Sequence, residues 1–156
     1  MTIAVRLQRY LESQGIGYDE MAHPRTLTSS RTAQVAHVPG RFVAKSVVVH
    51  HELGYALAVV PSSHRVELET LQELLGKRLG LAAEIEIAKV FDDCDLGAIP
   101  PIGAAYGVPV VVEESLVNAP DVYFEGGDHA TLVHVSGDAF RKLMNEGRTA
   151  RFSHPA

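Results

Sequence analysis

Several features that mark membrane, secreted and disulfide-bonded proteins are absent from this sequence. No apolar run approaches the roughly 20 residues that cross a bilayer. The N-terminal segment places Arg6, Arg9 and Glu12 inside an apolar pattern, which is typical of an amphipathic helix and not of a secretion signal. There is one cysteine, Cys94, so no intramolecular disulfide can form. We therefore expect a cytoplasmic protein without a membrane partner.

Motifs for common cofactors, metals and nucleophiles are also absent. The sequence has no P-loop, no Gly-x-Gly-x-x-Gly after a strand and no Gly-x-Ser-x-Gly. It has eight histidines but no His-Glu-x-x-His or cysteine-rich pattern, and the adjacent His50 and His51 would point to opposite faces of a strand. We expect neither a metal nor a cofactor, and a metal-dependent hydrolase is kept only as a third hypothesis. Cys94 has no histidine near it in sequence, which favours a structural or solvent-facing thiol over a catalytic one.

Charge is unevenly distributed along the 156 residues, whose net charge is −5. Residues 1–50 hold six Lys or Arg against three acidic residues, and the rest of the chain holds eight against sixteen. The acidic balance argues against a protein that coats nucleic acid through phosphate contacts alone. The basic N-terminal part either forms one face that attracts a short stretch of phosphates or reflects ordinary variation in the charge of a solvated surface.

Periodicity and turn residues divide the chain into helices and strands. Helices are predicted for 3–14 with Thr2 as N-cap, 31–38 with Ser30 as N-cap, 65–80, and 137–147 with Ser136 as N-cap. Strands are predicted for 16–23, 42–51, 55–61, 108–115, 121–127 and 131–136, and the C-terminal tail is partly extended. The segment 82–91 fits either a strand or a short helix. Since no repeat or long linker divides the chain, we predict one α+β domain over residues 1–156 with a bent, mixed sheet.

Lys45 stands in the middle of the apolar strand segment FVAKSVVV. An ammonium group in such a strand costs free energy unless it reaches water, a partner or a ligand. Lys45 therefore lies either on a solvated strand face or at a pocket, where it would hold an anionic or carbonyl group.

The segment GAIPPIG, residues 97–103, follows a charged stretch and precedes an apolar strand. Pro100 and Pro101 stiffen it, while Gly97 and Gly103 permit backbone turns that other residues resist. Such a stiff, apolar loop with free carbonyl groups can form the wall of a substrate site. It can equally be a rigid turn between two elements.

A second glycine pair precedes Asp128 and His129 in the segment GGDHA, residues 126–130. His129 can serve as a general base, as a hydrogen-bond donor to a reacting carbonyl, or simply as a turn residue.

These segments occur in an order and spacing that resembles the YbaK/prolyl-tRNA synthetase editing-domain family, the free-standing aminoacyl-tRNA deacylases. The resemblance covers residues 3–145 and rests on four stretches of sequence in order: RTAQVAHVPGRFVAKSVVV, GYALAVVPSSHRVEL, CDLGAIPPIGAAYGVPVVVEESL and VYFEGGDHATLVHVSGDAFRKL. It implies a partly barrel-like mixed sheet with helices around it. It also implies hydrolysis of the ester between a wrong amino acid and the 3′ end of a tRNA. In this family a water molecule attacks the ester, helped by the tRNA's ribose hydroxyl and by backbone groups, without a dedicated side-chain nucleophile.

The same resemblance implies roles for individual residues. Lys45 matches the family's strand lysine, which holds the terminal nucleotide or its phosphate, and residues 97–101 match the Gly-x-x-x-Pro loop beside the aminoacyl group. His129 matches a pocket position, and Ser46 falls where members differ with substrate choice. We therefore expect catalytic roles for Lys45, Gly97 and His129. The expected substrate-binding residues are Ser46, Ala98, Ile99, Pro100, Pro101, Gly127 and Asp128.

The implied partner is the acceptor end of a mischarged tRNA carrying a prolyl- or cysteinyl-type error. Because the chain is acidic overall, a tRNA synthetase or an elongation factor is an additional expected partner that delivers this substrate. Asp128 beside His129 would repel phosphate at the mouth of the pocket. The alternative hypothesis is a non-catalytic module that binds an aminoacylated tRNA end, a nucleotide or a protein in the same cleft.

Overall fold

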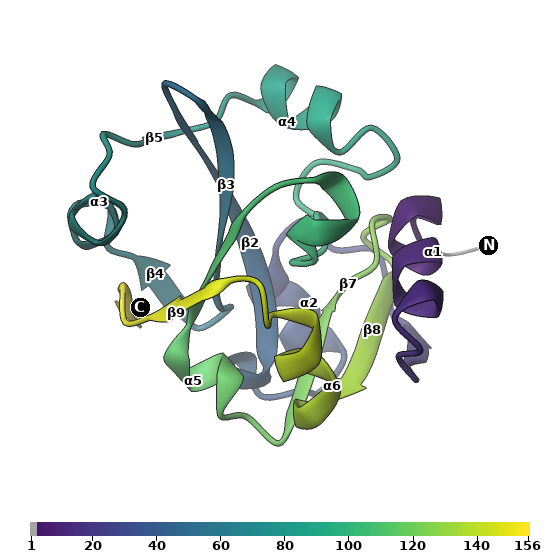
Figure 1. Ribbon diagram of the computed structural model, residues 1–156. Coiled ribbons are helices and arrows are strands. Elements are labelled where there is room, and N and C mark those ends of the chain that lie inside the picture. The colour runs from purple at the N-terminus through teal and green to yellow at the C-terminus, as the bar shows by residue number, and fades with distance from the viewer. Residues whose placement is uncertain (1–2) are drawn as a thin grey trace.

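A mixed sheet forms the framework of the computed structural model, which describes residues 3–156 (Figure 1). Its strands are β1 (Asp19–Ala22), β2 (Val43–His51), β3 (Gly54–Pro61), β5 (Gly80–Leu81), β6 (Val110–Glu113), β7 (Asp121–Glu125), β8 (Thr131–Ser136) and β9 (Arg148–Ala150). They follow the order β1-β8-β7-β2-β3-β6-β9, with β5 paired to β2. The pairings β2–β7, β3–β6 and β6–β9 are parallel and the others are antiparallel. A second sheet pairs β4 (His64–Val66) with β10 (Ser153–Pro155).

Short helices pack around this sheet. They are α1 (Val5–Ser13), α2 (Ser29–Val35), α3 (Leu68–Leu75), α4 (Glu84–Val90), α5 (Glu114–Val117) and α6 (Gly137–Leu143), with 3-10 turns η1 (Gly40–Phe42) and η2 (Gly103–Tyr106). None of the helices described for residues 3–156 has the length and apolar content needed to cross a membrane. The mixed sheet and the helices around it confirm the prediction of an α+β domain.

Alternation along the strands divides the core between the two faces of the sheet. Leu57 and Val59 of β3 belong to the larger cluster, which includes buried side chains of α1, α5 and α6. Their neighbours Ala58 and Val60 belong to the smaller cluster, which is completed by Leu71 of α3 and by residues near the C-terminus. The central hairpin is thus covered on both faces, which explains its nearly continuous apolar sequence.

The structure confirms most of the predicted elements, but two helices begin at residues other than those predicted. The Oγ atom of Thr28, and not of Ser30, caps α2 by accepting from Arg31 N at 3.1 Å. Ser30 instead donates to the carbonyl of Ser62. Residues 65–66, predicted as helix, lie in β4 because β10 supplies a distant pairing partner. The ambiguous segment 82–91 contains α4, and Thr2, the predicted cap of α1, lies outside the described residues.

Candidate functional site

The central strand β2 loses its neighbour over a short stretch, and a cavity lies at this opening. On one edge, β2 pairs with β7 only at Val43 and Ala44, and with β5 only at Val49 and His50. A cavity of about 300 Å³ is lined by residues on both sides of the gap: Ser29, Ala44, Ser46, Val47, Val48, Leu81, Ala82, Glu84, Ile87, Leu96, Gly97, Ile99 and Glu125. The walls are therefore largely apolar, with a few polar groups among them.

The backbone of Ser46 faces this cavity edge. Val43 accepts a backbone hydrogen bond from Ser62 at 2.7 Å on the β3 side, whereas Val48 accepts one from Ala82 at 3.0 Å on the opposite side. Backbone groups of a strand alternate between its two edges, so the N–H and C=O of Ser46 point away from β3. The cavity thus offers a rigid backbone donor and acceptor beside the Ser46 side chain.

The GAIPPIG loop forms the opposite wall, as its composition allows. Gly97 and Ile99 line the cavity together with the preceding Leu96, while Ala98, Pro100 and Pro101 are buried and do not belong to its lining. Gly97 has φ +84°, and a Cβ atom on it would lie 2.9 Å from His129 Cε1 and 3.1 Å from Leu27 O. Only glycine fits this conformation and this close approach without strain.

His129 lies behind the loop and outside the lining of the cavity. The residue is 3% exposed, and its Nε2 atom forms a hydrogen bond with the carbonyl of Leu96. Because a carbonyl oxygen can only accept, Nε2 carries the proton. His129 itself has φ +61°, a conformation that is rare for a residue with a side chain. The arrangement fixes the loop at the residue before Gly97.

Gly127 and Asp128 form a turn that also supports the loop. Asp128 accepts hydrogen bonds from Ala130 N at 3.0 Å and from Thr131 Oγ1 at 2.9 Å, so its carboxylate is engaged inside its own turn. The carbonyl of Gly127 accepts from Asp95 N at 2.7 Å. Neither residue lines the cavity: Gly127 holds the segment that leads into its wall, and Asp128 stabilises the turn that contains Gly127.

Lys45 lies next to Ser46 but on the other face of β2. Strand alternation places its side chain with Val47 and Val49, which pack in or against the smaller core cluster. Burial lowers the pKa of Lys45, and the nearby positive charge of Arg65 lowers it further. Within residues 3–156, Lys45 forms no ion pair. A half-buried cation beside a second cation is a favourable place for an anion.

Sequence reasoning missed the most deeply buried acid of the cavity, Glu125, and its partner His23. Glu125 is 3% exposed, and its Oε1 atom lies 2.7 Å from His23 Nε2. Burial raises the pKa of Glu125, and the hydrogen bond from His23 partly opposes this rise. The available signal was a carboxylate directly after Phe124 at the end of an apolar strand, a position where an acidic group is expensive to bury.

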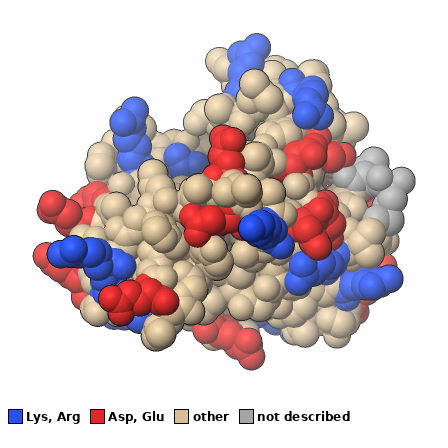
Figure 2. All heavy atoms as spheres, turned by 90° about the horizontal axis from the view of Figure 1, so that it is seen from above, with Lys and Arg blue, Asp and Glu red and all other residues tan. Residues whose placement is uncertain are grey.

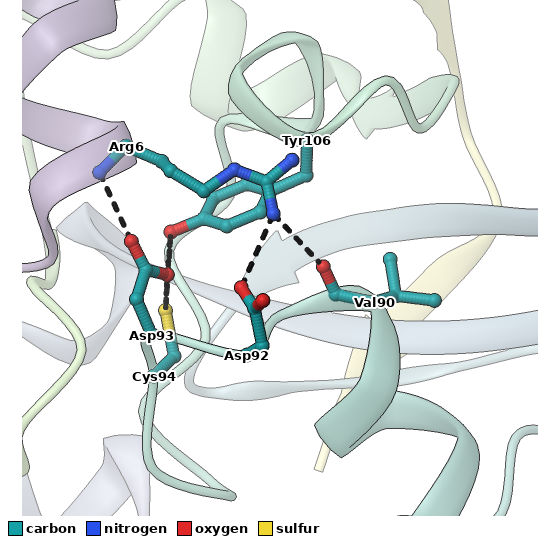
Figure 3. A network of polar contacts seen from close by, with 6 residues as sticks. All are labelled: Arg6, Val90, Asp92, Asp93, Cys94 and Tyr106. Atoms are coloured by element: carbon teal, nitrogen blue, oxygen red, sulfur yellow. Dashed lines mark hydrogen bonds and ion pairs between the residues drawn. The ribbon is translucent and has the colours of Figure 1, made fainter.

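A polar network anchors the segment before the loop to α1 (Figure 3). The backbone N–H of Arg6 donates to Asp93 at 2.9 Å, and its guanidinium lies 4.4 Å from the centre of the Tyr106 ring. The Tyr106 hydroxyl donates to Asp93 at 2.6 Å, and Cys94 Sγ lies 3.2 Å from that hydroxyl. Burial raises the pKa of the Cys94 thiol to about 12. The thiolate is therefore disfavoured, which supports the structural interpretation of Cys94.

The histidines do not gather into a metal site in the part of the chain that the structure describes. No group of three or more His, Cys, Asp or Glu side chains there has a geometry that could hold an ion.

Comparison with known proteins identifies the family. Residues 23–143 match the model of the aminoacyl-tRNA editing domain. None of the curated proteins matches the chain in sequence. Among solved structures, a scaffold protein used for computational epitope grafting is 27% identical, with TM-score 0.85 and coverage of 97% of both chains. A candidate trans-editing enzyme for prolyl tRNA synthetase is 26% identical, with TM-score 0.84 over 96% of this chain and 95% of that one. A hypothetical protein at 22% identity has the same fold, with TM-score 0.84 over 96% of this chain and 99% of that one.

The chain belongs to the aminoacyl-tRNA editing domain family, since the family model spans most of its length. The fold is that of the YbaK-type editing proteins, in agreement with the resemblance seen in the sequence. Its function therefore lies in aminoacyl-tRNA editing.

Proposed function

We propose that this protein acts in trans as an aminoacyl-tRNA deacylase and that the cavity beside β2 binds the aminoacyl group. The observation that carries the proposal is the cavity itself, which combines apolar walls, the backbone groups of Ser46 and the rigid loop at Gly97. A volume of about 300 Å³ is at the small end of ligand sites. It suits one amino acid and not a larger ligand.

In the proposed reaction, a water molecule adds to the ester carbonyl carbon, and the bond to the ribose oxygen then breaks. The Ser46 N–H is the backbone donor available to polarise the carbonyl as negative charge develops on its oxygen. The neighbouring ribose hydroxyl of the tRNA positions the water, and the leaving ribose oxygen takes up a proton. An ester is already activated, so positioning and polarisation supply most of the rate without a side-chain nucleophile.

The proposed role of Lys45 is to hold a phosphate of the tRNA end beside the cavity, on the face of β2 that it shares with the lining residue Val47. Its lowered pKa and its lack of an ion pair within residues 3–156 support this role, and Arg65 adds a second positive charge. His129, Gly127 and Asp128 would act indirectly, by fixing the loop whose wall contacts the amino acid. In this proposal His129 is a positioning residue.

Selection by size is assigned to Ile99, Val48 and Ile87, three of the branched side chains of the cavity wall. A larger amino acid would collide with them, whereas removal of one methylene from a ligand costs only about 1–3 kcal/mol of binding. We therefore expect release of small amino acids from mischarged tRNA.

The test is a deacylation screen across mischarged tRNAs with wild-type protein, Lys45→Ala and Lys142→Ala. Lys142 is an exposed lysine of α6, so its variant removes the same charge away from the cavity. We expect release of a small amino acid by wild type and by Lys142→Ala. Loss of a charged hydrogen bond predicts a decrease of about 10- to 150-fold in kcat/KM for Lys45→Ala. If wild type leaves every mischarged tRNA intact while a control deacylase works, the proposal fails, and saturable binding without turnover would support a binding module.

A further inference from the structure

Two buried polar side-chain atoms of residues 3–156 have no hydrogen-bond partner in the protein, and both belong to the same cavity. They are Ser46 Oγ and Glu125 Oε2. Buried polar groups are nearly always paired, because an unpaired one loses its hydration without compensation. Their coincidence in one cavity indicates a site that a ligand completes with hydrogen-bond donors.

The strand register explains how Glu125 reaches this position. Pairing between β2 and β7 ends at Ala44 and Phe124, and Glu125 is the next residue of β7. It therefore stands where the two strands separate, beside the stretch of β2 that carries Ser46. Lys45, the residue of β2 that is next in register, forms no ion pair with Glu125, whose Oε1 atom is paired with His23 instead. The carboxylate thus faces the cavity without a lysine to neutralise it.

His23 holds the Glu125 carboxylate at Oε1 and thereby determines which ligands the other oxygen, Oε2, can bind. His23 Nδ1 lies 2.8 Å from the carbonyl of Pro24, so Nδ1 must carry a proton. One further proton lies between His23 Nε2 and Glu125 Oε1, and it can reside on either atom. A cation at Oε2 favours the ionised carboxylate and keeps this proton on Nε2. An anion at the same place would be repelled.

We propose that Glu125 Oε2 and Ser46 Oγ bind the protonated α-amino group of the aminoacyl ester. This inference rests on the proposed function and adds a requirement to it, namely a free α-ammonium group on the substrate. An ammonium has several N–H donors, enough for the carboxylate and the hydroxyl together. The amino-acid side chain then lies against the apolar wall formed by Ile99, Val48 and Ile87.

Other occupants fit the site less well. A neutral acyl group with a hydroxyl in place of the amine supplies only one donor and no positive charge. An N-acylated amino acid has lost the charge and is also larger. The site should therefore distinguish aminoacyl groups from α-hydroxyacyl and N-acyl groups, independently of its selection by side-chain size.

The experiment compares the binding of two hydrolysis-resistant analogues of the tRNA end, 3′-alanylamino-3′-deoxyadenosine and its lactoyl counterpart. They have the same shape and differ in an α-amino against an α-hydroxyl group. We expect wild type to bind the alanyl compound about 10- to 150-fold more tightly, the range for a hydrogen bond to a charged group. Glu125→Gln keeps the shape of the side chain, and it should bring the two affinities together. Glu52→Gln, at the exposed β2–β3 turn, removes the same charge and should keep the preference.

The outcomes separate this inference from the proposed function. Equal affinity of wild type for the two analogues overturns the inference, and this comparison does not depend on whether the variant folds. A preference that persists in folded Glu125→Gln also overturns it, while deacylation by wild type would leave the proposed function intact. A preference for the alanyl analogue without any deacylation would support the inference and contradict the proposed hydrolysis. Failure to bind either analogue would contradict the inference, and it would contradict the proposed function as well if wild type also left every mischarged tRNA intact.

Discussion

At the scale of single residues, Gly97 carries the strongest steric constraint in the candidate site. Its left-handed φ of +84° would cost an alanine about 1–2 kcal/mol before any contact is considered. A methyl group would in addition press on the His129 ring and on the carbonyl of Leu27, and the ring is held in place by its own hydrogen bond. The wall of the cavity therefore depends on the absence of one side chain.

Gly97→Ala should lower both stability and deacylation, because the loop must move away from His129 to make room. We expect a loss of about 2–3 kcal/mol in the free energy of unfolding, measured by urea denaturation, and a decrease in kcat/KM. Gly76→Ala is the matched control, since Gly76 has φ +64° and a methyl group on it would meet nothing within 4 Å. It should lose only about 1 kcal/mol and keep its activity. Equal behaviour of the two variants would argue against a steric role for Gly97.

The residue types in the site could be predicted from the sequence more readily than the directions in which their side chains point. The apolar loop and its glycine could be identified because proline and glycine have strong local effects. The opposite orientations of Lys45 and Ser46 follow from strand alternation, but the sequence does not say which face meets the cavity. Glu125 was missed because its partner His23 lies 102 positions away in the chain. The roles assigned to the site residues stay predictions for experiment.

At the scale of elements, His134 of β8 connects three strands of the sheet. Its Nε2 lies 2.8 Å from Asp121 of β7 and its Nδ1 lies 3.1 Å from Asp19 of β1. Two carboxylate acceptors favour the doubly protonated ring. Burial lowers the pKa of His134, but the hydrogen bonds to the two aspartates outweigh this effect and raise it above the usual 6.5. The strand order β1-β8-β7 is thus reinforced by one charged side chain.

This raised pKa predicts that His134 stabilises the fold most at low pH. The contribution is fully present below the unfolded-state pKa of 6.5 and is lost as pH rises through the higher folded-state pKa. His134→Gln should therefore destabilise the protein by about 1 kcal/mol at pH 6 and by less at pH 9, measured by urea denaturation at both values. Asp121→Asn keeps the histidine and should weaken the same pH dependence. A difference between wild type and His134→Gln that grows with pH would contradict the assignment.

Element types followed well from the sequence, and the errors have identifiable causes. The hairpin of β2 and β3, the strands β7 and β8, and the capped helix α6 follow from local periodicity and turn residues. Residues 65–66 were wrongly placed in a helix, because their pairing with β10 joins segments far apart in sequence. The neighbours of β2, which create the cavity, likewise depend on parallel pairings that no local pattern specifies.

At the scale of the whole molecule, an acidic protein has to bind a polyanion. The net charge is −5, and the face seen in Figure 2 carries basic and acidic side chains interspersed with each other. Such a surface offers little attraction to a long duplex. Lys45 and Arg65, by contrast, are close enough for the charge of one to lower the pKa of the other. We therefore expect the protein to contact tRNA mainly at its single-stranded end.

Binding of a tRNA end should accordingly have a weak dependence on salt. Each phosphate that the protein neutralises on a single strand adds about 0.7 to the slope of log K against log salt concentration. We expect Arg65→Gln to reduce that slope by about 0.7, because the variant removes one cation beside Lys45. Arg141→Gln removes a cation of α6 that is paired with Asp138, and it should leave the slope unchanged. The measurement is a salt titration with a non-hydrolysable aminoacylated acceptor-stem minihelix and with full-length tRNA. A steep slope for full-length tRNA, unaffected by Arg65→Gln, would show that binding extends over the duplex and does not centre on the cavity.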